Sequence, residues 1–227
     1  MQARIEVRRG GPYAVQGDPP LLRTAIVKTE HGEPVDWDEG PSFLTPDGEY
    51  LLCRCDRSQQ RPFCDRACET IEWDWAETAD RRPTAARRGS FEGEDLILTD
   101  DLSLCSKAGF CTNLTTNVWT LVEEEGDDPE AREQLVGMVH RCPSGRLVLR
   151  ESDADEDLEP ALEPSIGVQP NGPFWVRGRI PVESEDGTTW EVRNRVTLCR
   201  CGHSRNKPFC DGSHKIVGFR DAAEPAT

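Results

Sequence analysis

The ten cysteines of the chain fall into three groups, and two of these groups share one spacing. The first group is C-x-C-x8-C-x3-C and comprises Cys53, Cys55, Cys64 and Cys68. The second is C-x-C-x8-C-x3-H and comprises Cys199, Cys201, Cys210 and His214. The third lies between them and comprises Cys105, Cys111 and Cys142. Thiolate sulfur and imidazole nitrogen are soft ligands for transition metals, so the pattern predicts three metal centres.

The similarity of the two outer groups extends to the elements that must position them. Each group is preceded by a Gly-Pro turn and a short apolar run, at residues 11–15 in the first repeat and 172–176 in the second. Each is followed at the same distance by an aromatic residue, Trp73 or Phe219. Turns that bound short apolar runs are typical of β-strands. The sequence therefore predicts two copies of one β-rich module.

The first copy is longer than the second. Pro12 and Pro173 are 161 residues apart, whereas Cys53 and Cys199 are 146 residues apart, so the first copy contains 15 more residues. We place this insertion in the polar Gly/Pro-rich stretch 30–48. In both copies the last two ligand positions are one helical turn apart, so both side chains can face one centre.

The segment between the copies alternates between strand-like and helical patterns. Apolar patches within residues 91–104 and 117–122 predict strands. Asp128 followed by Pro129 predicts the start of a helix, and Pro143 predicts its end. A closing strand is expected at 147–149. The mixture of strands and a helix is typical of an α+β module.

Composition and motifs limit which class of protein this chain can belong to. The formal charge of −15 and the pI of about 4.7 argue against nucleic-acid binding, which needs a basic face. The N-terminus has no apolar core of the signal-peptide type, and no stretch approaches a membrane span. We therefore expect a cytoplasmic protein without a membrane partner, whose cysteines stay reduced. No nucleophile–base pair, phosphate loop or dinucleotide motif occurs, so we expect no enzyme activity.

The residues of the outer groups leave two metal chemistries open. Three thiolates and an imidazole suit tetrahedral zinc. Alternatively, the C-x-C pair binds one iron of a binuclear cluster while the second pair binds the other iron. Disulfides are disfavoured, because neighbours two residues apart fit disulfide geometry badly and no secretory signal precedes them.

The second copy reads Cys210-Asp211-Gly212-Ser213-His214 and resembles the CDGSH iron–sulfur domain family of the mitoNEET type. This resemblance implies a [2Fe–2S] cluster whose ligands are Cys199, Cys201, Cys210 and His214. The first copy departs from the motif, because Cys68 stands where the second copy has His214. The resemblance still implies a [2Fe–2S] cluster there, with the four thiolates of Cys53, Cys55, Cys64 and Cys68 as ligands.

The middle group resembles bacterial single-cluster ferredoxins, in particular a divergent ferredoxin domain that occurs fused to CDGSH motifs. The usual pattern C-x2-C-x2-C…C-P would place a cysteine at Ala108, so three ligands remain, Cys105, Cys111 and Cys142. Three cysteines imply a [3Fe–4S] cluster. A [4Fe–4S] cluster with water or another side chain on its fourth iron is the alternative.

These inferences predict an α+β protein in which two small β-rich CDGSH modules form an intrachain pseudo-dimer. The N-terminal copy is expected at 1–78, the ferredoxin-like central module at 90–150, an acidic linker at 151–164 and the C-terminal copy at 165–221.

The predicted function is electron transfer by a monomer through two [2Fe–2S] clusters and one [3Fe–4S] cluster, toward redox partners with a basic docking face. The alternative is cluster transfer or redox and pH sensing, with His214 as the labile ligand.

Overall fold

The computed structural model describes residues 2–124 and 128–221. In these residues the chain forms three β-sheets. The first sheet has the strand order β12-β1-β2-β5. Its strands are β12 (Val182–Ser184), β1 (Arg4–Val7), β2 (Tyr13–Gln16) and β5 (Glu49–Leu52). Three of the four strands come from the N-terminal copy, and β12 comes from the C-terminal copy.

The second sheet has the order β13-β11-β10-β3-β4. Its strands are β13 (Arg195–Leu198), β11 (Phe174–Arg177), β10 (Ser165–Val168), β3 (Leu21–Lys28) and β4 (Pro34–Ser42). Here the C-terminal copy supplies three strands, and the N-terminal copy supplies β3 with the inserted strand β4.

The two copies thus exchange one strand each. β1 pairs in parallel with β12, with Ile5 opposite Val182, and β10 pairs in parallel with β3, with Ile166 opposite Leu21. The two pairings are equivalent, because the offset of 161 residues between the copies relates Ile5 to Ile166 and Leu21 to Val182. This reciprocal pairing confirms the predicted intrachain pseudo-dimer.

The exchange produces one hydrophobic core for both copies. Buried apolar side chains from both sheets pack into a single cluster, among them Ile5, Leu52, Ile166 and Leu198, each fully inaccessible to solvent. Neither copy has a separate core of this size, so the folded state of each depends on the other.

The central module has its own sheet and core. Its sheet order is β6-β7-β8-β9, with β6 (Gly89–Glu92), β7 (Leu96–Asp100), β8 (Leu147–Glu151) and β9 (Asp157–Leu158). The helices α1 (Val118–Glu124) and α2 (Pro129–His140) pack on it through apolar side chains such as Val118, Leu121, Leu135 and Val139.

Helix α2 confirms the predicted start at Asp128-Pro129, because the Asp128 carboxylate accepts a hydrogen bond from the Glu130 amide at 2.9 Å. The strand predicted at 117–122 is wrong, since this segment is helix α1. The Asn117 side-chain oxygen accepts from the amides of Trp119 and Thr120, and this cap favours the helix.

Short helical turns complete the chain. The 3-10 turns are Ala67–Thr70, Thr84–Ala86 and Leu102–Leu104, and α3 spans Ser213–Ile216. The acidic segment 151–164 is more than a solvated linker, because it contains β9 and because Glu159 binds the buried Arg195.

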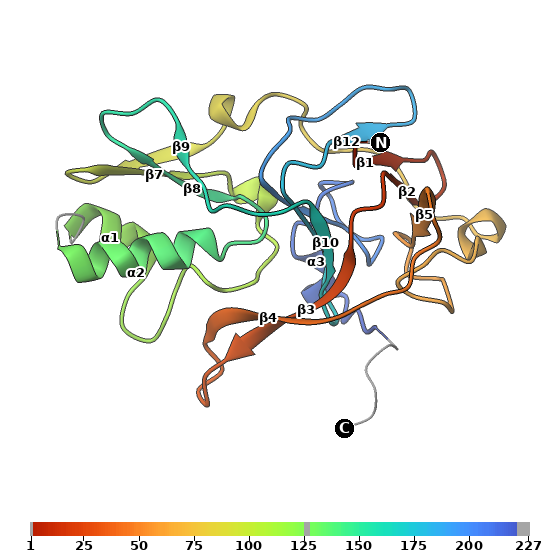
Figure 1. The fold of residues 1–227 in the computed structure, drawn as a ribbon, viewed down its shortest axis with the longest axis horizontal. Coiled ribbons are helices and arrows are strands. Elements are labelled where there is room, and N and C mark those ends of the chain that lie inside the picture. Colours follow the sequence, from red (N-terminus) through yellow and green to blue (C-terminus); the bar gives the residue numbers. More distant parts are fainter. Residues whose placement is uncertain (1, 125–127, 222–227) are drawn as a thin grey trace.

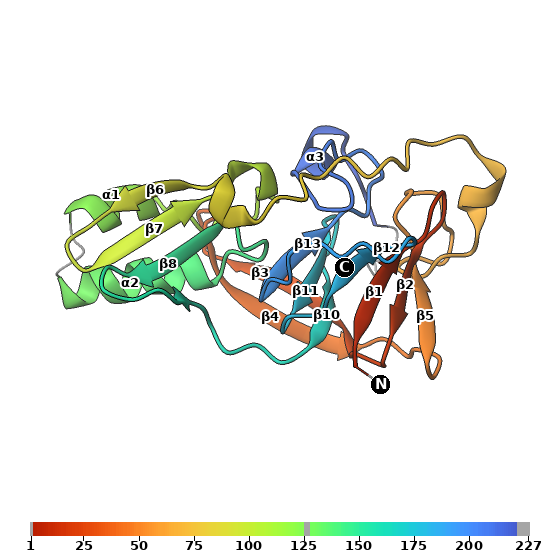
Figure 2. The same cartoon turned by 90° about the horizontal axis from the view of Figure 1, so that it is seen from above.

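The molecule is elongated, with the central module at one end and the sheet of β1, β2 and β5 at the other (Figure 1). The sheet that contains β10, β11 and β13 lies between them in both views (Figure 2). Within residues 2–124 and 128–221, none of the helices combines the length and the apolar character that crossing a bilayer requires.

Candidate metal centres

The four predicted ligands of the C-terminal copy lie together in two pairs. Cys199 and Cys201 follow β13, and their sulfurs are 3.8 Å apart. The Cys210 sulfur is 3.4 Å from Nδ1 of His214, which lies in α3. All four side chains are buried.

The N-terminal copy has the same two pairs. The sulfurs of Cys53 and Cys55, which follow β5, are 3.8 Å apart, and those of Cys64 and Cys68 are 4.0 Å apart. Cys64 is half-buried, whereas the other three side chains are buried. None of the ten cysteines, all of which lie in the described residues, forms a disulfide.

The distances within the pairs are those of metal ligands. Two sulfurs on one tetrahedral metal with bonds of about 2.3 Å lie about 3.8 Å apart, the separation found in each C-x-C pair. Each pair is therefore spaced as two ligands of one metal atom are. In the described residues, however, no three His, Cys, Asp or Glu side chains converge on one ion position.

One hydrogen-bond framework holds the ligand loop in both copies. The hydroxyls of Ser58 and Ser204 donate to the carbonyl oxygens of Phe63 and Phe209 at 2.7 and 2.6 Å. These bonds stabilise the turn, rather than contacting sulfur.

An aspartate next to the third cysteine fixes the following turn. Asp65 accepts from the amides of Gln59 and Ala67, and Asp211 accepts from those of Arg205 and Ser213. Because both carboxylates bind two backbone amides, the loop is ordered by its own residues.

Backbone amides also reach the sulfurs. The amide of Arg66 lies 3.3 Å from the Cys64 sulfur, and the amide of Gly212 lies 3.3 Å from the Cys210 sulfur. Both donors have left-handed backbone angles, with φ of 67° at Arg66 and 81° at Gly212. Burial raises the pKa of Cys64 and Cys210, and these N–H···S contacts act against it by favouring the thiolate, which is the form that binds metal.

The electrostatics of the C-x-C pairs favour one thiolate in each. A hydrogen bond from Cys55 lowers the pKa of Cys53 to about 6, and a hydrogen bond from Cys201 lowers the pKa of Cys199 to about 7. Burial lowers the pKa of His214 to about 4, so its imidazole is neutral near pH 7 and able to bind a metal.

The three cysteines of the central module also come together. Cys105, Cys111 and Cys142 line one small pocket, together with Ala108. Cys105 follows the turn Leu102–Leu104, and Cys142 follows the C-terminus of α2. The donor set is three thiols, and Ala108 offers no fourth ligand.

Arg146 contacts this group of cysteines, although the sequence did not single it out. Its Nη1 atom donates to the Cys105 sulfur at 3.2 Å, and its Nε and Nη2 atoms bind the Asp100 carboxylate at 2.6 and 2.7 Å. A cation that contacts a ligand sulfur stabilises the thiolate. The sequence feature that could have identified Arg146 is its position just after Cys142-Pro143.

Two family models match the chain. The model described as "Iron-binding zinc finger CDGSH type" matches residues 10–67 and 171–215, and the model described as "Divergent 4Fe-4S mono-cluster" matches residues 91–152. This is an iron–sulfur protein with two CDGSH domains around a divergent 4Fe-4S mono-cluster domain. No curated protein and no solved structure matches the chain.

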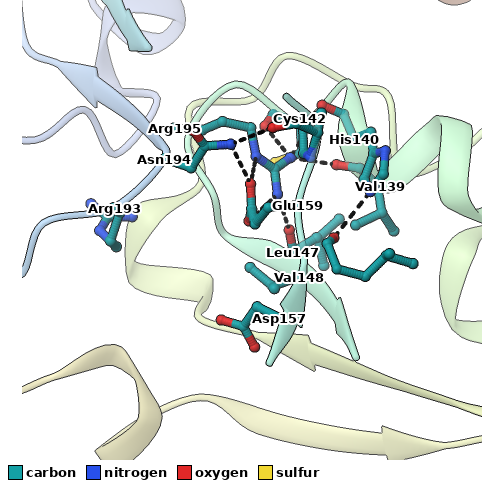
Figure 3. Close-up of polar contacts among 12 residues, drawn as sticks. Val139, His140, Cys142, Leu147, Val148, Asp157, Glu159, Arg193, Asn194 and Arg195 are labelled. Carbon is teal, nitrogen blue, oxygen red and sulfur yellow. Dashed lines mark hydrogen bonds and ion pairs between the residues drawn. The ribbon is translucent and has the colours of Figure 1, made fainter. Parts of the chain in front are cut away.

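Arg195 connects the C-terminal CDGSH copy to the central module, and Figure 3 shows its contacts. The side chain is fully buried. Its Nη1 atom donates to the carbonyl oxygens of Val139 and Cys142 at 2.7 and 2.9 Å. Its Nε and Nη2 atoms bind the Glu159 carboxylate at 2.8 and 2.7 Å.

This arrangement positions the loop that carries Cys142. Arg195 lies on β13, the strand that leads directly to Cys199, so one side chain links the peptide segments of two metal centres. Arg195 could not be selected from the sequence, because arginines are frequent in this chain and its partners lie up to 56 residues away.

The ligand loop of the C-terminal CDGSH copy contacts both of its neighbours. The side chain of Asn206 donates to the carbonyl oxygen of Ser103 at 2.9 Å, close to Cys105. A Cβ atom at Gly202 would lie 3.4 Å from backbone atoms of Cys55. The loop therefore packs between the central module and the N-terminal copy.

Proposed function

We propose that the protein transfers single electrons through two [2Fe–2S] clusters and one [3Fe–4S] cluster. The observation that carries this proposal is the arrangement of each outer ligand set as two pairs. The residues proposed as ligands are Cys53, Cys55, Cys64 and Cys68 for the first [2Fe–2S] cluster, Cys199, Cys201, Cys210 and His214 for the second, and Cys105, Cys111 and Cys142 for the central cluster.

The residues present fit this cofactor. Thiolates with a neutral imidazole are the donors that iron–sulfur clusters take, and both C-x-C pairs contain a thiol with a lowered pKa. A cluster bound here supplies reversible one-electron oxidation and reduction. The chain holds the ligands, excludes water from most of them and donates backbone hydrogen bonds to sulfur, all of which affect the reduction potential.

The contacts between modules support an order for the electron path. The C-terminal copy touches the central module through Asn206 and the N-terminal copy through Gly202. We therefore place the C-terminal centre in the middle of the path. Arg195 acts as a positioning residue, because it fixes the distance between this copy and the loop of Cys142.

We also propose the partners, the compartment and the oligomeric state of the protein. A net charge of −15 favours redox partners with a basic docking face, through steering that salt screens. Cluster binding needs reduced thiols, which is why we propose the cytoplasm as the compartment. We propose an electron carrier rather than an enzyme, acting as a monomer.

Cluster transfer or pH sensing through His214 is the alternative. Such a role would benefit from a solvent-exposed imidazole that gains a proton in mild acid. His214 is 5% exposed, and burial lowers its pKa to about 4. These two observations favour electron transfer.

Metal analysis and EPR spectroscopy of anaerobically purified protein test the proposal. We expect iron and sulfide without zinc, a three-iron signal in the oxidised protein and two binuclear signals after reduction. Zinc in place of iron would overturn the proposal. Absence of the three-iron signal would overturn the central assignment alone.

Single ligand variants assign each signal to its site. Cys64→Ala, Cys210→Ala and Cys111→Ala should each remove one EPR signal, and the first two should each remove about two irons per chain. Ser103→Ala is the control, because it keeps the backbone contact to Asn206 and removes only the hydroxyl's hydrogen bonds with Asp101 and Arg87.

A further inference from the structure

A pocket with a volume of about 480 Å³ lies where all three modules meet. Strand β3 of the N-terminal copy, residues 106–108 of the central module, and residues 169–172 with α3 of the C-terminal copy line it. We name it the lysine pocket, after Lys28, Lys107 and Lys215. Its size is that of sites for small molecules.

The lysine pocket concentrates positive charge in an acidic protein. The chain contains four lysines, and three of them line this pocket together with Arg220. No carboxylate is among its lining residues in the described part of the chain. The fourth lysine, Lys207, is buried and donates to Asp74 at 2.9 Å.

The cations of the lysine pocket are not neutralised by acidic side chains. Most arginines of this chain bind carboxylates, but within residues 2–124 and 128–221 none of the four pocket cations forms an ion pair. The Lys215 ammonium donates to the backbone carbonyl oxygen of Lys107, so these two lysines lie next to each other. Adjacent like charges are unfavourable unless an anion binds between them.

Two buried polar atoms at the lysine pocket also lack a partner. The Nε2 atom of Gln169 and the Oγ1 atom of Thr24 have no hydrogen bond in the described structure, although the residues are only 6% and 0% exposed. Both residues line the pocket. Buried polar groups are normally paired, so these two can serve as donors to a ligand.

The N-terminal copy shows that the lysine pocket is not a by-product of the fold. At the positions equivalent to Lys215 and Arg220, this copy has Glu69 and Asp74. The position equivalent to Thr24 is Glu185. Acidic residues stand at all three equivalent positions, so the positive charge of the lysine pocket is not repeated on the other side of the pseudo-dimer.

We propose that the lysine pocket binds a small anion that carries phosphate groups. Lysine ammonium groups are common phosphate ligands, and three of them with one guanidinium can neutralise a polyanion. His214 lines the same pocket, and residues 106–108 adjoin Cys105. A bound anion would therefore lie beside His214 and close to the segment that carries Cys105, and this consequence rests on the proposed function.

Calorimetric titration of the purified protein with pyrophosphate at constant ionic strength tests the proposal. We expect saturable binding at one site per chain, weaker binding of citrate, and at least about tenfold weaker pyrophosphate binding in the double variant K107Q/K215Q. Citrate binding as tight as pyrophosphate binding would overturn the assignment to phosphate. No saturable binding would overturn the site.

Matched variants separate the site from general charge effects. R57Q/R82Q removes two exposed positive charges outside the lysine pocket and should leave affinity within about twofold of the wild type. K28Q changes an exposed residue at the end of β3, so it tests the lysine pocket even if the double variant does not fold. Equal weakening by R57Q/R82Q, or no weakening by K28Q, would overturn the proposal.

The iron content and EPR spectrum of each sample are measured in parallel. Normal cluster signals without pyrophosphate binding would reject the lysine pocket and leave the proposed electron transfer intact. Pyrophosphate binding to protein that contains zinc would support the lysine pocket and reject electron transfer.

Discussion

In the C-terminal copy Cys210 is 3% exposed, whereas its equivalent in the N-terminal copy, Cys64, is half-buried. The hydrogen bonds of the two ligand loops are nevertheless the same, from the serine hydroxyl to the aspartate that binds two amides. The difference arises outside the loop, because the C-terminal copy is covered by neighbours on two sides. A common scaffold thus holds ligands in two different environments.

The residue after the aspartate that both copies share, Gly212 or Arg66, shows how contact with the central module constrains the amino-acid sequence. Gly212 and Arg66 are equivalent, and both adopt a left-handed backbone. A Cβ atom at Gly212 would lie 2.5 Å from the Lys107 side chain, so contact with the central module favours glycine there. For Arg66 the left-handed angle is tolerated with a side chain that is 71% exposed.

The largest expected effect is on stability, and it should differ between Arg195 and Glu49, which occupies the same strand position in the N-terminal copy. Arg195→Gln leaves Glu159 and several carbonyl oxygens without their partner, so we expect a loss of about 3–5 kcal/mol in the free energy of unfolding. Glu49→Gln weakens a half-exposed pair with Arg8 and should cost within about 1 kcal/mol. Urea denaturation under anaerobic conditions measures both, and similar losses would contradict the comparison.

Exchanging the one different ligand should exchange the redox properties of the copies. Cys68→His replaces a thiolate by a neutral imidazole and should raise the reduction potential of the N-terminal centre by on the order of 100 mV. His214→Cys should lower the potential of the C-terminal centre by a similar amount. Potentiometric titration followed by EPR checks this, and shifts of the same sign in both variants would refute it.

The two copies should also differ in their stability toward acid, which is the next largest effect. In the unfolded chain His214 binds a proton near its ordinary pKa of about 6.5, whereas burial lowers its pKa in the folded protein to about 4. The stability that neutral His214 contributes is therefore lost as pH falls through this window. We expect visible absorbance of the C-terminal centre to bleach faster between about pH 6 and 4. His214→Cys should remove this acceleration.

The smallest effect concerns a contact that only one copy makes. The Tyr13 hydroxyl lies 3.0 Å from the carbonyl oxygens of both Cys199 and Pro208, but its equivalent, Phe174, has no hydroxyl. Tyr13→Phe should lower stability by about 1 kcal/mol, because buried carbonyl groups lose a donor. Thermal unfolding measures the change, and an unchanged unfolding midpoint would contradict this prediction.

The sequence was sufficient for those features that depend on local spacing. The ligand pairs, the start of α2 at Asp128 and the duplication of β-rich modules follow from short motifs and from the offset between copies. The family models confirm the two CDGSH domains and the divergent ferredoxin-type domain. The roles of the individual ligands and the types of cluster remain predictions.

Features that depend on distant contacts could not be predicted. Residues 117–122 have a strand-like composition, but the Asn117 cap and packing on the central sheet make them helical. Neither Arg195 nor the lysine pocket has a local motif, because each is assembled from segments of different modules. The pseudo-dimer was predicted, but the strand exchange that forms it, with Leu21 paired to Ile166, was not.

The exchange of β3 and β12 has a consequence for synthesis. Strand β3 of the N-terminal copy pairs with β10, which leaves the ribosome about 140 residues later. The sheet that contains both strands therefore cannot form while the central module is being synthesised. The central module is built from the contiguous residues 89–158 and can fold in the meantime. We therefore expect the middle domain to be assembled first, and the two outer copies to acquire their final form together.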